Sequence, residues 1–205
     1  MGIYQRLILP RLTQLVCGME PMMRQREKVV PRARGRVLEV GLGTGLNLRY
    51  YDPAAVTAVV GLEPSTDMAA LAEHEAASMA FPVEIVLAPA EDIPFEDAAF
   101  DTIVMTYTLC SIPDPLAALR QMARVLKPGG RLLFCEHGAA PDAAVRRWQQ
   151  RLTPLWQRFA GGCRLDRDTP ALLAGGGFRI ESLETMYLPG WRPATFNYWG
   201  SAAPK

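Results

Sequence analysis

The sequence predicts an α/β domain built on a mostly parallel sheet. Short apolar segments of strand length alternate with segments of helical spacing, a pattern typical of parallel sheets covered by helices. A glycine-rich turn at residues 41–45 follows the first of these strands, and an acidic residue, Glu63, ends the second. With 205 residues, 49% of them hydrophobic, the chain is long enough to bury the core of one ordinary domain.

Residues 3–19 place apolar side chains at helical spacing, and Pro10 interrupts the pattern. We expect a broken helix or two short helices there, because proline removes a backbone donor and obstructs the preceding turn. Gly35 then opens the main domain. We therefore divide the chain into an N-terminal helical lid over residues 1–34 and an α/β domain over residues 35–205.

The remaining elements follow in alternation. Strands are expected at residues 36–40, 56–62, 83–87, 100–107 and 131–135. Helices are expected at residues 46–51, 66–80, 116–126, 143–159 and 170–174. Ser65 or Thr66 suits the N-cap of the second helix, and residues 127–130 stop the third. Residues 178–188 and 195–203 are expected to pair as a closing hairpin.

The turn after the first strand carries Gly41, Gly43 and Gly45 at alternate positions. A turn without side chains lets a ligand lie against bare backbone at the end of a strand. A dinucleotide fingerprint requires another glycine where this chain has Leu46. Glu39, inside the strand, would repel a pyrophosphate and attract an ammonium group. A ligand with a ribose, an ammonium and no phosphate fits better, and S-adenosylmethionine is such a ligand.

Glu63 lies at the end of the second strand, 22 residues after Gly41. A carboxylate at this position can accept hydrogen bonds from both hydroxyls of a ribose. The alternative is a surface acid that flanks the next helix beside Pro64. Because the glycine turn is present, we favour the ribose.

The formal net charge of +1 gives no general reason to expect a nucleic-acid partner. Residues 1–36, however, carry eight Lys or Arg against two Glu, a balance of +6 that leaves −5 for the rest. Such a segment is either a solvated face or a surface attracted to an anionic membrane. No apolar run is long enough to span a bilayer and no signal peptide is visible. We expect a cytoplasmic protein, with peripheral contact with an anionic membrane as the open alternative.

The four cysteines are scattered without a Cys-x-x-Cys pair, at Cys17, Cys110, Cys135 and Cys163. This spacing suggests neither a zinc site nor a disulfide framework, so we expect no metal. Reduced thiols fit a cytoplasmic location.

Five motifs occur in order over residues 36–135. They are Glu39 with Gly41-Leu42-Gly43-Thr44-Gly45, Gly61-Leu62-Glu63-Pro64, Ala90-Glu91-Asp92-Ile93-Pro94-Phe95, Phe100-Asp101-Thr102-Ile103-Val104 and Leu126-Lys127-Pro128-Gly129-Gly130. The set resembles the class I S-adenosylmethionine-dependent methyltransferases. The resemblance implies a Rossmann-like seven-stranded sheet in the order 3-2-1-4-5-7-6 with the last strand antiparallel. It also implies S-adenosylmethionine as cofactor and S-adenosylhomocysteine as product.

A narrower likeness extends towards the C-terminus. This part of the chain resembles the methyltransferase-like thiol S-methyltransferases and their bacterial relatives. The residues that carry the likeness are 108–112, Glu136-His137, Trp148 with Pro154 and Trp156, 162–165 and the Tyr198-x-Gly200 tail. Some of those relatives are labelled phospholipid N-methyltransferases. The resemblance implies methyl transfer to a small apolar nucleophile, with a thiol first and a phospholipid amine second. Binding of the cofactor without catalysis is the third hypothesis.

Transferred to this chain, the family's cofactor contacts fall mainly at the strand ends. They are Glu39, Gly41, Leu42, Gly43, Gly45, Asn47, Glu63, Pro64, Ala90, Glu91 and Thr106. Glu39 would bind the aminoacyl ammonium, directly or through water, and Glu63 the ribose. Many members place an aspartate for the adenine amino group where this chain has Pro89. The backbone at Ala90 and Glu91, or the Glu91 side chain, is therefore expected to contact the adenine.

Methyl transfer needs alignment of donor and acceptor more than it needs acid–base groups. A thiol still reacts as its thiolate, and His137 at the end of the fifth strand is the expected base. The alternative for His137 is a packed, hydrogen-bonded histidine. The residues expected to line the acceptor pocket are Tyr4, Tyr107, Cys110, Trp148 and Trp156. The two tryptophans belong to an apolar stripe that equally fits a helix packed on the core.

Overall fold

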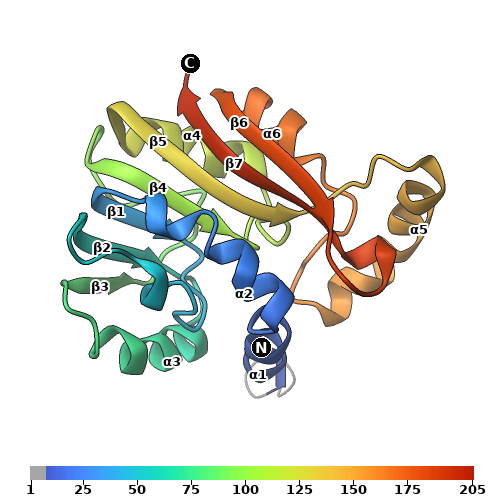
Figure 1. The fold of residues 1–205 in the computed structure, drawn as a ribbon, viewed down its shortest axis with the longest axis horizontal. Helices are drawn as coiled ribbons and strands as arrows, with labels where there is room; N and C mark the ends of the chain where they lie inside the picture. The colour runs from blue at the N-terminus through green and yellow to red at the C-terminus, as the bar shows by residue number, and fades with distance from the viewer. Residues whose placement is uncertain (1–7) are drawn as a thin grey trace.

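The computed structural model describes residues 8–205, which form a seven-stranded sheet flanked by helices (Figure 1). The strands are β1 (Gly35–Val40), β2 (Val56–Leu62), β3 (Val83–Val86), β4 (Phe100–Thr106), β5 (Leu126–His137), β6 (Phe178–Tyr187) and β7 (Phe196–Pro204). Their order is β3-β2-β1-β4-β5-β7-β6. The first five strands are parallel, and β7 runs antiparallel to both β5 and β6. The predicted strand order and the closing hairpin are confirmed.

The helices of the described chain are α1 (Leu9–Cys17), α2 (Glu20–Arg26), α3 (Thr66–Ala76), α4 (Pro115–Val125), α5 (Ala143–Phe159) and α6 (Thr169–Gly175). Helices α4 and α6 pack on each other and against β5 and β6, whereas α2 crosses near the carboxyl ends of β1 and β4 (Figure 1). Within residues 8–205, no helix combines the length and apolar character needed to cross a membrane.

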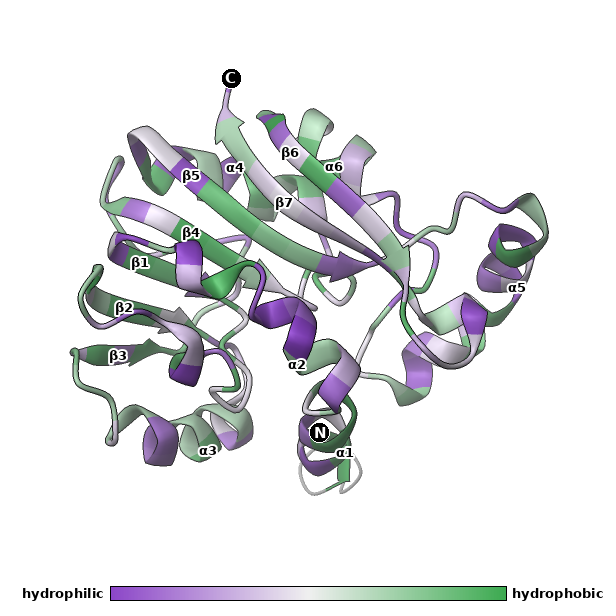
Figure 2. Cartoon of the chain, viewed as in Figure 1, coloured by the Kyte–Doolittle hydropathy of each residue, from purple (hydrophilic) through white to green (hydrophobic). Residues whose placement is uncertain are grey.

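Both faces of the central strands are buried. Leu38 and Ile103 pack in the core cluster that includes Leu119 of α4. Their neighbours Val37 and Val104 point to the opposite face and pack in a second cluster. Figure 2 shows β1, β4 and β5 as hydrophobic along their middle, with a hydrophilic carboxyl end on β5. Burial on both faces is typical of a parallel sheet. Polar residues at the ends of such strands are therefore candidates for a functional site.

The N-terminal helical segment breaks at a different place from the predicted one. Pro10 lies in the first turn of α1, where its missing N–H would have no intrahelical partner in any case. The break falls instead at Gly18 and Met19, where Met19 is extended and serves as the N-cap of α2. The chain after α2 then enters the core, with Val29 and Val30 fully buried.

Two further expectations require correction. The helix predicted over residues 46–51 is only a single 3-10 turn, Leu48–Tyr50, because Tyr51 turns extended and sends its hydroxyl to Glu39. Strand β5 starts at Leu126, directly after α4, rather than at residue 131. Leu126 pairs with Phe100, and a register irregularity in the β4–β5 pairing accommodates residues 127–130, which were expected only to stop the helix. Helix α3 begins, as predicted, with Ser65 as its N-cap.

Candidate active site

A cavity of about 1270 Å³ lies at the carboxyl ends of β1, β2, β4 and β5. Ligands of open α/β sheets bind at this edge, and typical small-molecule pockets span about 300–1,000 Å³. The volume is therefore sufficient for a cofactor together with an acceptor. The glycine turn and Glu63 line one part of the cavity, and side chains of α1 and α5 line another.

The glycine turn forms part of the cavity wall. Gly41 and Gly43 have φ values of +74° and +59°, a conformation that favours glycine. Gly43 lines the cavity. A Cβ added to it would meet no atom within 4 Å and would project into open space. A Cβ on Gly41 would lie 2.3 Å from the Thr108 side chain. Gly45 lies outside the wall, where an added Cβ would meet Leu48 and α3.

Glu63 connects the ends of β1 and β2. Its Oε2 accepts a hydrogen bond from the backbone N–H of Gly43, and its Oε1 accepts one from Ser65, both at 2.9 Å. Burial raises the pKa of Glu63, and the two N–H donors oppose that rise. The carboxylate and the adjacent Pro64 both line the cavity, where a ligand hydroxyl could reach them.

Glu39 is buried behind the wall and does not line the cavity. Its carboxylate accepts hydrogen bonds from Asn47 Nδ2 at 2.9 Å and from the Tyr51 hydroxyl at 2.7 Å. Burial raises the pKa of Glu39 from 4.5 to about 7. Direct contact with a ligand ammonium would require these neighbours to shift, so the role of Glu39 as ammonium ligand stays a prediction. Asn47 likewise lies behind the wall.

Arg26 of α2 is a cavity residue that sequence analysis missed. Its Nη1 donates to Asn47 Oδ1 at 2.8 Å and to Thr106 Oγ1 at 2.5 Å, while its buried Nε has no partner within the described part of the chain. Its guanidinium also lies over the Tyr107 ring, 5.1 Å from the centroid. An unpaired buried donor is costly, which suits a site for an anionic group such as a carboxylate. Its position in a strongly basic segment gave no local signal that this one side chain enters the cavity.

The expected adenine side also lines the cavity. Pro89, Ala90 and Glu91 all contribute to the wall. Glu91 Oε1 accepts a hydrogen bond from the backbone N–H of Asp114 at 3.1 Å, which ties this loop to the start of α4. The proposed adenine contacts of Ala90 and Glu91 stay predictions.

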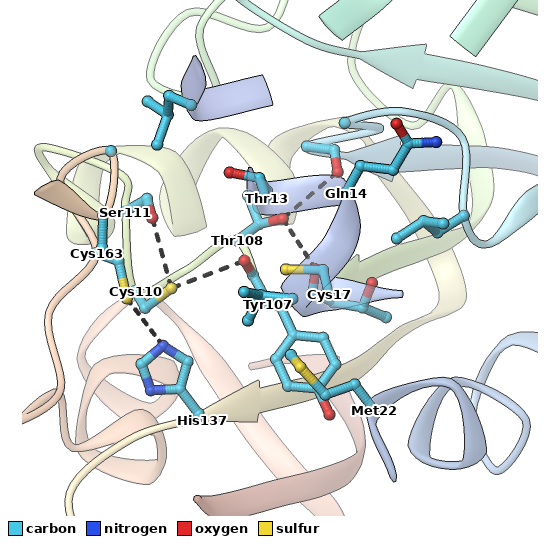
Figure 3. Close-up of a pocket in the computed structure, with 18 of the residues that line it drawn as sticks. Thr13, Gln14, Cys17, Met22, Tyr107, Thr108, Cys110, Ser111, His137 and Cys163 are labelled. Carbon is cyan, nitrogen blue, oxygen red and sulfur yellow. Dashed lines mark hydrogen bonds between the residues drawn. The ribbon is translucent and has the colours of Figure 1, made fainter. Parts of the chain in front are cut away.

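At another part of the cavity, Cys110, His137 and Cys163 converge from three separate segments (Figure 3). His137 Nε2 lies 3.1 Å from Cys163 Sγ, and Trp156 Nε1 donates to the same sulfur at 3.4 Å. Hydrogen bonding between the two cysteines lowers the pKa of the Cys163 thiol and, together with burial, raises the pKa of Cys110 well above its ordinary value. The chain positions, 110, 137 and 163, gave no hint of this contact.

The other residues predicted to line the acceptor pocket are only partly found at the cavity. Tyr107, Cys110 and Trp156 line the cavity, whereas Trp148 does not and is 56% exposed. Tyr4 lies outside the described residues. Tyr107 has a positive φ of +54°, a strained conformation that is common at functional sites. Its hydroxyl donates to Asn197 Oδ1 at 2.8 Å.

Glu136, beside His137, is fully buried and positions the loop that carries Cys110. Its Oε1 accepts hydrogen bonds from the backbone N–H groups of Thr108 and Leu109, at 2.9 and 3.1 Å. Burial raises the pKa of Glu136 to about 7. Among residues 8–205 its second oxygen has no hydrogen-bond partner, and its two backbone contacts hold the loop.

Exposed apolar side chains surround part of the cavity. They are Leu12, Val16, Met19, Leu155, Phe159 and Trp191, which both line the cavity and are at least 42% exposed. They belong to α1, its continuation towards α2, the end of α5 and the loop before β7. The predicted role of the N-terminal helices as a lid rests on this position and stays a prediction.

The residues present fit S-adenosylmethionine. Gly43 leaves open space for a ligand, Glu63 faces the cavity with hydrogen-bonding oxygens, and Arg26 offers a buried donor. This site and the strand order define a class I S-adenosylmethionine-dependent methyltransferase.

Comparisons with known proteins agree with this class. The family described as methyltransferase domain matches residues 38–134. The thiol S-methyltransferase TMT1B of Homo sapiens is 35% identical over 176 residues, which cover 83% of this chain and 72% of the relative. The chain therefore belongs to the S-adenosylmethionine-dependent methyltransferases, and it is an enzyme that uses S-adenosylmethionine.

Other relatives carry different acceptor names. A phosphatidylethanolamine N-methyltransferase of Cereibacter sphaeroides is 38% identical over 130 residues, which cover 60% of this chain and 63% of the relative. A crystal structure from Thermotoga maritima, of an S-adenosylmethionine-dependent methyltransferase named as a possible histamine N-methyltransferase, superposes with a TM-score of 0.69. At 23% identity, with 99% of this chain and 98% of that chain covered, that likeness shows the fold alone.

Proposed function

We propose that the enzyme transfers the methyl group of S-adenosylmethionine to a small apolar thiol. The observation that carries the proposal is the composition of the acceptor end of the cavity. Apolar residues of α1 and α5 lie there with His137 and two cysteines, and Glu63 and Glu91 are the only carboxylates among the described lining residues. Both carboxylates belong to the expected cofactor side. A cationic amine would lose water there without gaining a counter-charge, whereas a neutral alkyl thiol would not.

The protein's contribution to the reaction is mainly positioning. S-adenosylmethionine supplies a methyl group already activated by its sulfonium charge. Glu63 and the Gly43 turn would hold the ribose, and Arg26 would hold the carboxylate of the methionine part. Apolar side chains such as Leu152 and Trp156 would exclude water and bury the tail of the acceptor.

The acceptor thiol must also lose its proton, because the thiolate is the nucleophile. We propose that His137 promotes this ionisation. It is the only histidine among the described lining residues, and it ends β5 beside Cys110 and Cys163. The name shared by several relatives, thiol S-methyltransferase, supports the same acceptor class.

A phospholipid amine is the second candidate acceptor. The exposed apolar residues around the cavity would suit a lipid chain, and one relative is named for phosphatidylethanolamine methylation. The absence of a carboxylate at the acceptor end, within the described residues, makes this candidate weaker.

A methyl-transfer assay with labelled cofactor distinguishes the two candidates. The purified chain is offered alkyl thiols, primary amines, phenols and phosphatidylethanolamine vesicles, and each product is identified by mass. We expect S-methyl products from the alkyl thiols, with longer alkyl tails favoured. Methylation of the phospholipid amine without turnover of any thiol would overturn the thiol proposal while leaving the family and cofactor unchanged.

A further inference from the structure

Three potential metal ligands meet at the acceptor end of the cavity. Cys110 Sγ, a ring nitrogen of His137 and Cys163 Sγ all lie within 4.8 Å of one another. Cys110 follows β4, His137 ends β5 and Cys163 follows α5, so the fold brings together three distant segments. All three line the same cavity (Figure 3).

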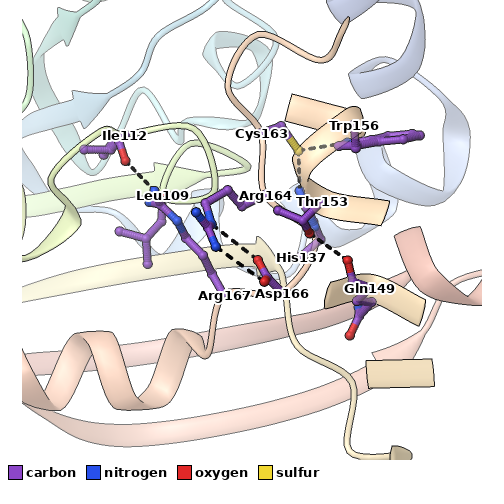
Figure 4. A network of polar contacts seen from close by, with 10 residues as sticks. All are labelled: Leu109, Ile112, His137, Gln149, Thr153, Trp156, Cys163, Arg164, Asp166 and Arg167. Atoms are coloured by element: carbon purple, nitrogen blue, oxygen red, sulfur yellow. Dashed lines mark hydrogen bonds and ion pairs between the residues drawn. The ribbon is translucent and has the colours of Figure 1, made fainter. Parts of the chain in front are cut away.

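The segments that carry the two cysteines are fixed to each other. The backbone N–H of Arg164 donates to the carbonyl of Cys110 at 3.0 Å. The Arg167 guanidinium donates to the carbonyl of Ile112 at 2.6 Å and also to that of Leu109 (Figure 4). The backbone segments that carry the two cysteines are therefore held together without a metal, a feature of preorganised sites.

The cysteine sulfurs also have few competing partners. Cys163 Sγ accepts from Trp156 Nε1 at 3.4 Å and lies 3.1 Å from His137 Nε2. Outside the cluster, Cys110 Sγ has long contacts among the described residues, 3.7 Å to the Tyr107 carbonyl and 3.5 Å to Ser111 Oγ. The indole N–H beside Cys163 would stabilise a thiolate there, in the way that outer hydrogen bonds support ligands of known metal sites.

We propose that Cys110, His137 and Cys163 bind one zinc ion. Two thiolates and one imidazole match the ligand preference of zinc, and a Cys₂His set with a fourth position left open is a known catalytic arrangement. In tetrahedral geometry, bonds of about 2.0–2.3 Å place ligand atoms about 3.5–3.8 Å apart, which the present spacing reaches with small shifts. Because all three residues line the cavity, a fourth ligand would reach the ion from there.

The inferred metal deepens the proposed function and rests on it for its chemical role. An acceptor thiol would occupy the fourth position, lose its S–H proton to water and stay as a bound thiolate. The sulfur electron pair then forms the new S–CH₃ bond, while the methyl–sulfonium bond breaks and its electron pair returns to the departing sulfur. His137 would thus promote ionisation as a metal ligand. The active site would need no other base for the thiol.

Metal binding is measured on the full chain, purified with a non-chelating reductant and stripped of metal. We expect one zinc per chain in a competition titration, and a cobalt–thiolate absorption band when cobalt replaces zinc. Cys110→Ser and Cys163→Ser should each weaken zinc binding at least 100-fold and remove much of the band. Cys17→Ser, which changes a cysteine that lines the same cavity outside the cluster, should leave zinc affinity unchanged. Circular dichroism checks that each variant folds.

The result that overturns the inference is a chain that binds no stoichiometric zinc, or one whose zinc affinity survives Cys163→Ser. An alkyl thiol should also shift the cobalt spectrum by entering the open position. Zinc binding without methylation of any thiol would support the site and contradict the proposed acceptor. Full thiol turnover by folded, metal-free enzyme would support the thiol acceptor and contradict the role of the metal. Failure of the metal site and failure of the thiol proposal therefore give different results.

Discussion

The backbone N–H of Gly43 donates a hydrogen bond to Glu63 Oε2, with 2.9 Å between nitrogen and oxygen. The other carboxylate oxygen accepts from Ser65, the N-cap of α3. Glu63 therefore connects the glycine turn after β1 to the helix after β2. The residue assigned to the ribose also holds the turn against which the ligand would lie, so its loss should affect binding in two ways.

Glu63→Ala should lower the affinity for S-adenosylmethionine by roughly 1.5–3 kcal/mol, the scale of a hydrogen bond to a charged group. Isothermal calorimetry measures the change directly. Glu84→Ala, an exposed acid on β3, is the matched control and should bind as the parent does. Unchanged affinity in the Glu63 variant would remove this carboxylate from the cofactor site.

Local patterns were sufficient to predict the strands of the sheet and to place the glycine turn and Glu63 at strand ends. The apolar strands, the glycine turn and Glu63 each depend on a few consecutive residues, and the strand order followed from the family resemblance. The helix predicted over residues 46–51 was wrong, because Tyr51 is extended and its hydroxyl donates to Glu39. No local sequence pattern encodes that contact.

The acceptor side could not be predicted to the same extent. Arg26 appeared to belong to a solvated basic segment, yet it is 5% exposed and contacts Asn47 and Thr106. The meeting of Cys110 with Cys163 depends on how α5 returns the chain to the end of β4. Such contacts arise from packing between distant segments, which spacing along one sequence does not reveal.

Arg26→Met should weaken cofactor binding, because it removes the buried donor proposed for the methionine carboxylate. Loss of a charge-assisted hydrogen bond is typically worth roughly 1.5–3 kcal/mol, or about 10- to 150-fold in affinity. Arg24→Met, on the same helix but exposed, is the control and should leave affinity near that of the parent. Binding of S-adenosylmethionine is compared with binding of an analogue that lacks the carboxylate. Equal losses for both ligands would contradict the carboxylate role.

Glu39 should make stability depend on pH. Its pKa is about 7 in the folded protein and about 4.5 when exposed, so the unfolded chain loses this proton first. The contribution of Glu39 to stability therefore falls as pH rises from about 4.5 to 7 and is constant above that range. At 1.36 kcal/mol per pKa unit, the loss is about 3 kcal/mol. Urea unfolding of the parent and Glu39→Gln at pH 5 and pH 8 tests this; parallel pH dependence in both would refute it.

His137→Ala should reduce turnover of an alkyl thiol by roughly 10²–10⁴-fold, the scale typical of losing a group that assists proton removal. Binding of S-adenosylmethionine should change little, because His137 lies with Cys110 and Cys163 on the acceptor side. His74→Ala removes the chain's other histidine, which is exposed on α3, and should retain activity. Single-turnover rates and calorimetry separate the two effects. Normal thiol turnover by His137→Ala would exclude the proposed role.

The exposed apolar side chains of α1 should contact anionic membranes. Leu15 is 70% exposed and Leu12 is 42% exposed, and they lie in the segment whose charge balance is +6. Each basic side chain near an anionic surface contributes about 1 kcal/mol, and salt screens the attraction. The chain should therefore sediment with anionic vesicles, less so in high salt, and not with neutral ones. Leu15→Glu should weaken binding, whereas Leu71→Glu, at an exposed position on α3, should not. Equal binding to both vesicle types, or binding to neither, would contradict the attraction of α1 to anionic membranes. The proposed lid over the cavity would then be its remaining role.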